Sequence, residues 1–187
     1  MKSSTNTWES AYKQVESMWG LKPDSLLVRY ASLVPEGQVL DIGVGEGPNA
    51  FFFAQKGYDV LGIDLSATAI ERCTERAKEA KLNFTGKVGS FVKLDIEAES
   101  YSLIIASMVM QFLKPSESQT VFQRLMRGPQ LNGLIYITTF SLEDPGHQRV
   151  KEQHAPEVEG NTFYHPKLGS HIHYFQKDEL LGQVSEL

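Results

Sequence analysis

Three glycines at alternate positions and one aspartate form the part of this chain best suited to chemistry. Gly43, Gly45 and Gly47 follow a short apolar run, and Asp64 ends a second one. Glycine adopts backbone angles closed to other residues and lets a ligand approach the main chain. A carboxylate at the end of the second run can accept both hydroxyls of a ribose. The pattern predicts a strand, a glycine-rich turn, a helix and a second strand that together hold a nucleoside.

Asp41 indicates which nucleoside this is. It lies two positions before the first glycine, inside the end of the first predicted strand. A carboxylate there would repel the pyrophosphate of a dinucleotide and attract a ligand that carries an ammonium and a sulfonium. Pro48 can begin the next helix, whose first turn would then offer free N–H groups to the carboxylate of that ligand. The residues favour S-adenosylmethionine over NAD.

The segment 39–47 with Asp64 resembles the cofactor-binding motifs of the class I S-adenosylmethionine-dependent methyltransferases. The runs 43–50, 54–60 and 64–66 are similar to the tellurite-resistance and thiopurine methyltransferase-like branch. The resemblance covers about residues 8–187 and implies S-adenosylmethionine as cofactor, with S-adenosylhomocysteine as product. It implies cofactor contacts at Asp41, Gly43, Gly45, Gly47, Asn49, Asp64, Leu65, Ser90, Phe91, Ser107, Met108 and Trp19.

Predicted strands and helices alternate along the chain, which is typical of a parallel sheet covered by helices. We expect a single α/β domain, 1–187, built as a three-layer, Rossmann-like sandwich. The resemblance implies the strand order 3-2-1-4-5, without the family's C-terminal strands 6 and 7. The expected strands are 38–42, 58–63, 84–92, 101–107 and 134–140, and the expected helices are 7–19, 25–33, 48–56, 66–81 and 116–127.

Two positions depart from the family pattern on the adenine side. Ser90 stands where an acidic residue often ends the third strand, and Ser102 replaces the usual Asp that opens the fourth. Backbone groups at Ser90 and Phe91 could still contact adenine, with the Phe ring packed on it. After the fourth strand, residues 107–112 lack the Asn/Asp-Pro-Pro-aromatic signature of enzymes that methylate amide or exocyclic nitrogens, so a small-molecule acceptor is expected.

Two regions are candidates for the acceptor side. Residues 1–34 form a predicted N-terminal helical lid that carries Trp8, Tyr12 and Trp19, and residues 141–175 form a polar insertion with all five histidines. Long loops at this edge usually shape the substrate pocket. No catalytic residue is compelled by the chemistry; His173 and Arg149 are the candidates to remove a proton or hold an anionic acceptor. No metal is expected, because the histidines lack a nearby Cys or a tight carboxylate partner.

Composition and charge indicate which partners and which cellular compartment to expect. The formal net charge is −5 and no basic stripe is present, so nucleic acid is not an expected partner. The single Cys73 excludes a disulfide framework, suits a reducing compartment and fits core packing. No signal peptide or long apolar run predicts membrane association. We therefore expect a cytoplasmic protein.

The C-terminal segment leaves one sheet edge open. Residues 176–187 resemble the helix that precedes two closing strands in the family, and the sequence ends there. A fifth strand without that cover would present unpaired backbone groups. We therefore expect self-association, for which a homodimer is the candidate, or poor solubility of the isolated chain.

Three functional hypotheses follow. The first is an enzyme that methylates a small soft nucleophile, such as a thiol or a chalcogen oxyanion. The second is a protein that binds S-adenosylmethionine or S-adenosylhomocysteine without turnover, which the changes at Ser90 and Ser102 motivate. The third is a nicotinamide-dependent oxidoreductase, against which stand Asp41 and the Gly-x-Gly-x-Gly spacing.

Overall fold

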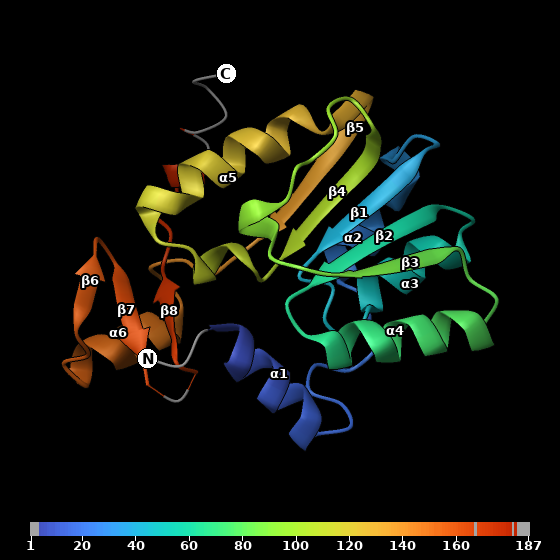
Figure 1. The fold of residues 1–187 in the computed structure, drawn as a ribbon. Helices are drawn as coiled ribbons and strands as arrows, with labels where there is room; N and C mark the ends of the chain where they lie inside the picture. The colour runs from blue at the N-terminus through green and yellow to red at the C-terminus, as the bar shows by residue number, and fades with distance from the viewer. Residues whose placement is uncertain (1–3, 167, 181, 183–187) are drawn as a thin grey trace.

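Five parallel strands in the order β3-β2-β1-β4-β5 form the centre of the molecule (Figure 1). The computed structural model describes residues 4–166, 168–180 and 182. The predicted fold class and strand order are confirmed. The strands are β1 (Gln38–Ile42), β2 (Asp59–Asp64), β3 (Phe84–Val88), β4 (Tyr101–Ser107) and β5 (Pro129–Thr138).

Helices cover both faces of this sheet. One face packs against α2 (Ser25–Tyr30), the 3₁₀ turn η1 (Ala31–Leu33), α3 (Pro48–Gln55) and α4 (Ala67–Glu79), through residues such as Leu27, Phe53 and Ile70. The other face packs against α5 (Pro115–Arg127) and the turn η2 (Phe91–Lys93), chiefly through Phe122 and Leu125. The result is a three-layer sandwich with β1 and β4 buried at its centre.

Residues 141–175 fold into a second unit, which we call the cap. It contains α6 (Pro145–Glu152) and a three-stranded antiparallel sheet of β6 (Glu157–Glu159), β7 (Thr162–His165) and β8 (Ser170–His173). The cap and α1 (Ser4–Gln14) lie beyond the carboxyl ends of the parallel strands, with the turn η3 (Met110–Phe112) between them and the main sheet (Figure 1). The expected polar insertion is therefore an ordered subdomain with its own apolar cluster.

Several predicted boundaries are corrected. The first helix ends at Gln14 rather than at residue 19, because residues 15–20 are held by side chains of the main domain. The third strand ends at Val88, so Ser90 and Phe91 follow it in a loop and a 3₁₀ turn. The fifth strand begins at Pro129 and contains a bulge. Half of the helix expected over 176–187, residues 181 and 183–187, lies outside the described residues.

Candidate active site

Residues 43–47, which follow β1 and which we call the glycine loop, are hydrogen-bonded to Asp64 at the end of β2. The backbone N–H of Gly45 donates to Asp64 Oδ2 at 2.9 Å, and the N–H of Ser66 donates to Oδ1 at the same distance. Burial raises the pKa of Asp64, although the backbone N–H groups of Ser66, Gly45 and Leu65 oppose this. Asp64 is thus fixed with its half-buried carboxylate at the carboxyl edge of the sheet, beside Leu65, which is also half-buried.

At two positions of the glycine loop, neighbouring groups lie too close to the backbone for any residue other than glycine. Gly43, Gly45 and Gly47 have φ of 69°, 55° and 79°, in the left-handed region. A Cβ on Gly43 would lie 3.0 Å from Val109 Cγ1, in the loop after β4, so this glycine brings the ends of β1 and β4 together. A Cβ on Gly45 would lie 2.8 Å from the hydroxyl of Tyr12 on α1. The loop therefore fits only without side chains at these positions.

Asp41 is buried beneath this loop, with 3% of its surface exposed. Burial raises the pKa of its carboxyl to about 8; the N–H of Ala50 in the first turn of α3 opposes the shift, and the charge of Asp64 adds to it. At neutral pH an isolated Asp41 is therefore largely protonated. Because this carboxyl accepts the Ala50 N–H, and Pro48 has no N–H, the first turn of α3 has fewer N–H groups for a ligand than the sequence predicted.

Glu9 joins α1 to the start of α4. Its carboxylate accepts hydrogen bonds from the Ser66 hydroxyl at 2.7 Å and the Thr68 hydroxyl at 2.8 Å, and from the Thr68 N–H at 3.2 Å. These hydroxyls lower the pKa of Glu9 to about 2, the Ser66 bond contributing most. A carboxylate is favoured at this place, since the N-terminus of a helix carries partial positive charge.

Glu46, between two of the motif glycines, holds the segment after α1. Its two carboxylate oxygens accept the backbone N–H groups of Met18, Trp19 and Gly20 at 2.9, 2.6 and 2.9 Å. Burial opposes ionisation of Glu46, but the N–H groups of Trp19 and Met18, the Ser17 hydroxyl and the N–H of Gly20 lower its pKa overall. The glycine loop and the N-terminal segment are thus joined through one side chain, an arrangement that we call the Glu46 clasp.

Aromatic side chains of this N-terminal segment lie over the glycine loop. Tyr12 is buried, and its hydroxyl accepts a hydrogen bond from Trp19 Nε1 at 3.2 Å. Trp19 itself is 64% exposed. On the cap side, the ring of Trp8 packs edge-on against Phe112 at 5.0 Å between centroids. The N-terminal segment therefore reaches from the glycine loop to η3, at the place where the lid was predicted.

The ends of β3 and β4 supply the remaining predicted cofactor residues. The N–H of Gly89 donates to the Asp64 carbonyl at 2.8 Å, which places half-buried Ser90 and Phe91 next along the same edge. Ser107, at the end of β4, shares a hydrogen bond with Thr138 at 2.9 Å.

Met108 has an unusual backbone conformation at the end of β4. Its φ is 55°, and its N–H donates to the Thr138 carbonyl at 2.9 Å, while its own carbonyl accepts from Gln111 Nε2 at 2.7 Å. A left-handed conformation is uncommon for a residue with a side chain, and such outliers cluster at functional sites. Met108 is thereby presented at the carboxyl edge, with 40% of its surface exposed.

Asn49 has a contact that the sequence did not indicate. Its Oδ1 accepts the N–H of Asp24 at 2.9 Å, while the Asp24 side chain caps α2. Asn49 therefore links α3 to α2 and is buried. Its predicted role in cofactor binding stays a prediction.

The two candidate catalytic residues are not brought into the glycine-loop cluster by any described contact. His173 is 2% exposed and uses both ring nitrogens, Nδ1 with the Thr162 hydroxyl at 2.9 Å and Nε2 with Glu179 at 2.8 Å. Arg149 is exposed on α6, and its Nε donates to the Pro145 carbonyl of the same helix at 3.3 Å. His173 and His171 do share one face of β8, as their alternation predicted.

The two ring nitrogens of His147 have different surroundings. Its Nδ1 lies 2.9 Å from the Leu142 carbonyl, which can only accept, so Nδ1 donates this hydrogen bond. Its Nε2 is buried without a hydrogen-bond partner among the described residues, close to the rings of Tyr174 and Phe163. The sequence pointed to the region of His147 but could not distinguish it from the other four histidines.

No group of three or more His, Cys, Asp or Glu side chains is placed to hold a metal ion in residues 4–166, 168–180 and 182. Within that part of the chain no helix has the length and apolar character needed to cross a bilayer. Cys73 is buried, its Sγ lies 3.3 Å from the Gly45 carbonyl, and burial raises its pKa to about 12. Its predicted place in the core is confirmed.

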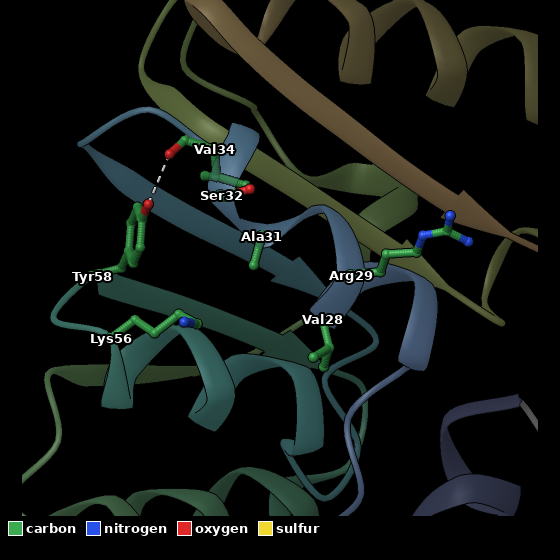
Figure 2. A pocket seen from close by; sticks show the side chains of 7 residues that line it. All are labelled: Val28, Arg29, Ala31, Ser32, Val34, Lys56 and Tyr58. Carbon is green, nitrogen blue, oxygen red and sulfur yellow. Dashed lines mark hydrogen bonds between the residues drawn. The ribbon is translucent and has the colours of Figure 1, made fainter.

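A cavity of about 560 Å³ lies at the opposite, amino-terminal edge of the sheet. It is lined by Val28, Arg29, Ala31, Ser32, Val34, Lys56 and Tyr58, and the Tyr58 hydroxyl donates to the Val34 carbonyl at 2.8 Å. Figure 2 shows that the Arg29 guanidinium points away from the other six lining residues. The lining residues precede β1 and β2, whereas the motif glycines and Asp64 lie at the carboxyl ends of these strands.

Comparisons with known proteins identify a family and several relatives of this chain. A family model described as a methyltransferase domain matches residues 39–133. Carboxy-S-adenosyl-L-methionine synthase of Yersinia enterocolitica is 25% identical over 138 residues, 71% of this chain and 50% of the relative. Probable S-adenosyl-L-methionine-dependent methyltransferase TehB of Haemophilus influenzae is 24% identical over 119 residues, 63% of this chain and 41% of the relative. This chain thus spans about half or less of the length of these curated relatives.

Solved structures agree with the fold. The CcbJ methyltransferase from Streptomyces caelestis superposes with a TM-score of 0.73 at 18% identity, covering 99% of this chain and 87% of that one. At such identity the agreement concerns the fold alone.

Proposed function

The chain belongs to the methyltransferase domain family, and from that premise we propose that it binds S-adenosylmethionine and transfers the methyl group to a small molecule. The observation that carries the proposal is the pairing of Asp64 with the glycine loop through the Gly45 N–H at 2.9 Å. This bond leaves further lone pairs of the carboxylate for the two hydroxyls of a ribose.

Asp41 supports a cationic ligand. Its carboxyl is buried beneath the loop, where burial raises its pKa to about 8. An ammonium or sulfonium brought near it would favour the ionised form, so the binding of the ligand would release a proton at neutral pH. A diphosphate would not gain this attraction, which weighs against the nicotinamide hypothesis.

The lid supplies a further element suited to a sulfonium. Tyr12 and Trp19 lie over Gly45, and the face of an aromatic ring attracts a cation. A lid over the edge of the sheet also excludes water, which strengthens electrostatic interactions inside the site. The Glu46 clasp keeps these rings in register with the loop that would hold the cofactor.

Methyl transfer itself demands alignment rather than a particular side chain. A lone pair of the acceptor forms a bond to the methyl carbon while the carbon–sulfur bond breaks, and S-adenosylhomocysteine leaves as a neutral thioether. An anionic acceptor reacts without a base, whereas a hydroxyl or neutral thiol must lose a proton. Met108, Ser107 and Thr138, at the ends of β4 and β5, lie where the acceptor would approach.

We propose a thiol or a chalcogen oxyanion as acceptor. The relative TehB and the resemblance to the tellurite-resistance branch support a soft, anionic nucleophile. The hydrogen bonds at both ring nitrogens of His173 support the same kind of acceptor. An acceptor that is already ionised needs no histidine to take its proton. The relatives named carboxy-S-adenosyl-L-methionine synthase suggest a competing activity for the same site.

A second candidate is a binding protein without turnover. The departures at Ser90 and Ser102 motivate it, although Ser102 has a structural place, donating to the Gln38 carbonyl at 3.0 Å. We further propose that the protein is cytoplasmic and does not use nucleic acid as a partner, in keeping with its net charge of −5.

Two assays test these functions. Calorimetric titration with S-adenosylmethionine, S-adenosylhomocysteine and NAD should give binding of the first two and none of the third. Transfer of a labelled methyl group should then be measured over a panel of thiols, selenite and tellurite. Label in a product supports the enzyme, while cofactor binding without product over the panel supports the binding protein. Binding of NAD alone would exclude both.

A further inference from the structure

We infer that Gln111 is a positioning residue for methyl transfer, whose side-chain amide holds Met108 in the conformation that presents this residue to the methyl acceptor. The inference rests on the proposed function and deepens it. It is supported by the exposure of Met108, by the backbone conformation of Met108 and by the hydrogen bonds of the buried Gln111 amide.

Within residues 101–111, all of which the structure describes, Met108 is the single exposed residue. Residues 101–106 and 109–111 are buried and Ser107 is half-buried, whereas Met108 has 40% of its surface exposed. It follows β4 at the carboxyl edge of the sheet, where the proposed function places the acceptor. A polarisable, apolar thioether at this place suits contact with a sulfur-bound methyl group and with a soft nucleophile.

The setting of Met108 differs from that of the other residues with a left-handed backbone. Six residues other than glycine have a positive φ in the described part of the chain. Besides Met108, these are residues directly after a helix, a residue in an exposed turn and asparagines: Lys81, His154, Glu99, Asn132 and Asn161. Helix ends and asparagine commonly adopt this conformation. Met108 follows a buried strand instead, so its conformation needs contacts that hold it.

Gln111 supplies such a contact. It is 2% exposed, and both ends of its amide are bound: Nε2 donates to the Met108 carbonyl at 2.7 Å, and Oε1 accepts from the Thr139 hydroxyl at 3.3 Å. The opposite orientation of the amide would bring Oε1 against the Met108 carbonyl oxygen, so these two bonds fix the direction of the amide. Because Thr139 directly follows β5, Gln111 connects the end of β4 with the end of β5.

The segment that Gln111 holds also contacts the glycine loop. The Met108 N–H donates to the Thr138 carbonyl at 2.9 Å, and a Cβ on Gly43 would lie 3.0 Å from Cγ1 of the next residue, Val109. Met108 is therefore held between β5 and the loop that would bind the cofactor. A displaced Met108 would disturb the alignment of the acceptor with the methyl group, on which the rate of transfer depends. We therefore expect loss of the Gln111 amide to lower kcat more than cofactor affinity.

Gln111→Met tests the inference in the full chain, because it keeps the length of the side chain and removes both hydrogen bonds. Transfer of labelled methyl to the best acceptor of the thiol, selenite and tellurite panel should show kcat lowered about 10- to 100-fold, since a misplacement of about 1 Å can cost about 100-fold. The affinity for S-adenosylhomocysteine, measured by calorimetry, should not change. The exposed Gln123 on α5 gives the matched control Gln123→Met, which should keep the wild-type kcat. Thr139→Val is a milder second variant that removes the hydroxyl bound by Gln111, and it should lower kcat in the same direction.

Met108→Gly distinguishes positioning through Met108 from a purely structural role of Gln111. It should lower kcat by itself, because the thioether is lost. Glycine adopts a positive φ without support, so Gln111→Met should cause no further fall of kcat in the Met108→Gly background. A Gln111→Met protein with the wild-type kcat, or an equal fall in both backgrounds, would overturn the inference and leave the proposed function standing. A wild-type protein that transfers no label to any acceptor would refute the proposed function and this inference together.

Discussion

The glycine loop with its lid and the cap of residues 141–175 both stand over the carboxyl edge of the sheet, but they use polar groups differently. In the first region each carboxylate oxygen of Asp64 accepts one backbone N–H and keeps a further lone pair for a ligand. In the cap, His173 has both nitrogens bound by the chain itself. The difference indicates that the loop region is built for a ligand, whereas much of the cap's polarity maintains the cap.

Asp64→Asn tests the loop side with the largest expected effect. Loss of a charged acceptor for two hydroxyls should weaken S-adenosylmethionine binding about 100-fold, since hydrogen bonds to charged groups contribute about 1.5–3 kcal/mol each. The exposed Asp59, at the amino end of the same strand, offers the control Asp59→Asn. Calorimetry should show full affinity for the control; an Asp64→Asn protein that binds as tightly as the control would break the comparison.

His173→Ala tests the cap side. Removal of a buried side chain with two hydrogen bonds should lower the free energy of unfolding by about 2–3 kcal/mol, because Thr162 and Glu179 lose their partner. Cofactor affinity should not change. Chemical denaturation measures the first effect, with His171→Ala, half-buried on the same strand, as a milder control. A stable variant that binds cofactor but lacks turnover would instead give His173 a catalytic role.

Glu46→Ala should affect both stability and ligand binding, because the Glu46 clasp joins the lid to the loop. Loss of three N–H partners should reduce cofactor affinity about tenfold, equivalent to about 1.4 kcal/mol. Hydrogen exchange at Met18, Trp19 and Gly20 should rise in parallel. The nearby exposed Glu16 gives the matched variant Glu16→Ala. Unchanged exchange at residues 18–20 would show that the lid is held by other contacts.

Acid should loosen the same lid. Glu9 and Glu46 have lowered pKa values, so their stabilising contribution is fully present above the unfolded value of 4.5 and is lost as pH falls through the folded values. For Glu9 the window runs from about 4.5 to about 2. Fluorescence of Trp8 and Trp19 should report this loss, and Glu9→Gln should show a smaller change over that window. An identical titration of the two proteins would contradict the role of Glu9.

Asp41 gives the opposite pH dependence. Its pKa is raised from 3.8 to about 8, so the protonated form contributes stability that is present below 3.8 and lost as pH rises through 8. Asp41→Asn should therefore lose less thermal stability than the wild type between pH 6 and pH 8.5. Differential scanning calorimetry at several pH values measures the slope. Parallel slopes would mean that the wild-type carboxyl is already ionised near neutral pH.

The turn after β1 and the strands around it could be predicted from the sequence because the residues that form them are close together in the chain. The glycine spacing and Asp64 lie within 22 residues, and the β1 and β4 strands are apolar enough to be identified as buried. The Glu46 clasp was missed because its three partners lie 26–28 residues away in a loop without a pattern. An acidic residue at the start of a helix was the available signal, and local capping explained it equally well.

The cap was predicted only as an insertion that carries histidines. Its short strands β6, β7 and β8 depend on pairing with one another, and three or four residues give too short a period to identify them. The state of each histidine depends on tertiary partners such as Leu142, Thr162 and Glu179. Position along the chain therefore could not separate His147 from His173.

The most direct test is a crystal structure of the chain with S-adenosylhomocysteine bound. We expect the two ribose hydroxyls on the Asp64 carboxylate, the amino group toward Asp41 and the ligand beneath Tyr12 and Trp19. Density for the ligand in the cavity beside Lys56 and Tyr58, with the glycine loop empty, would contradict the account.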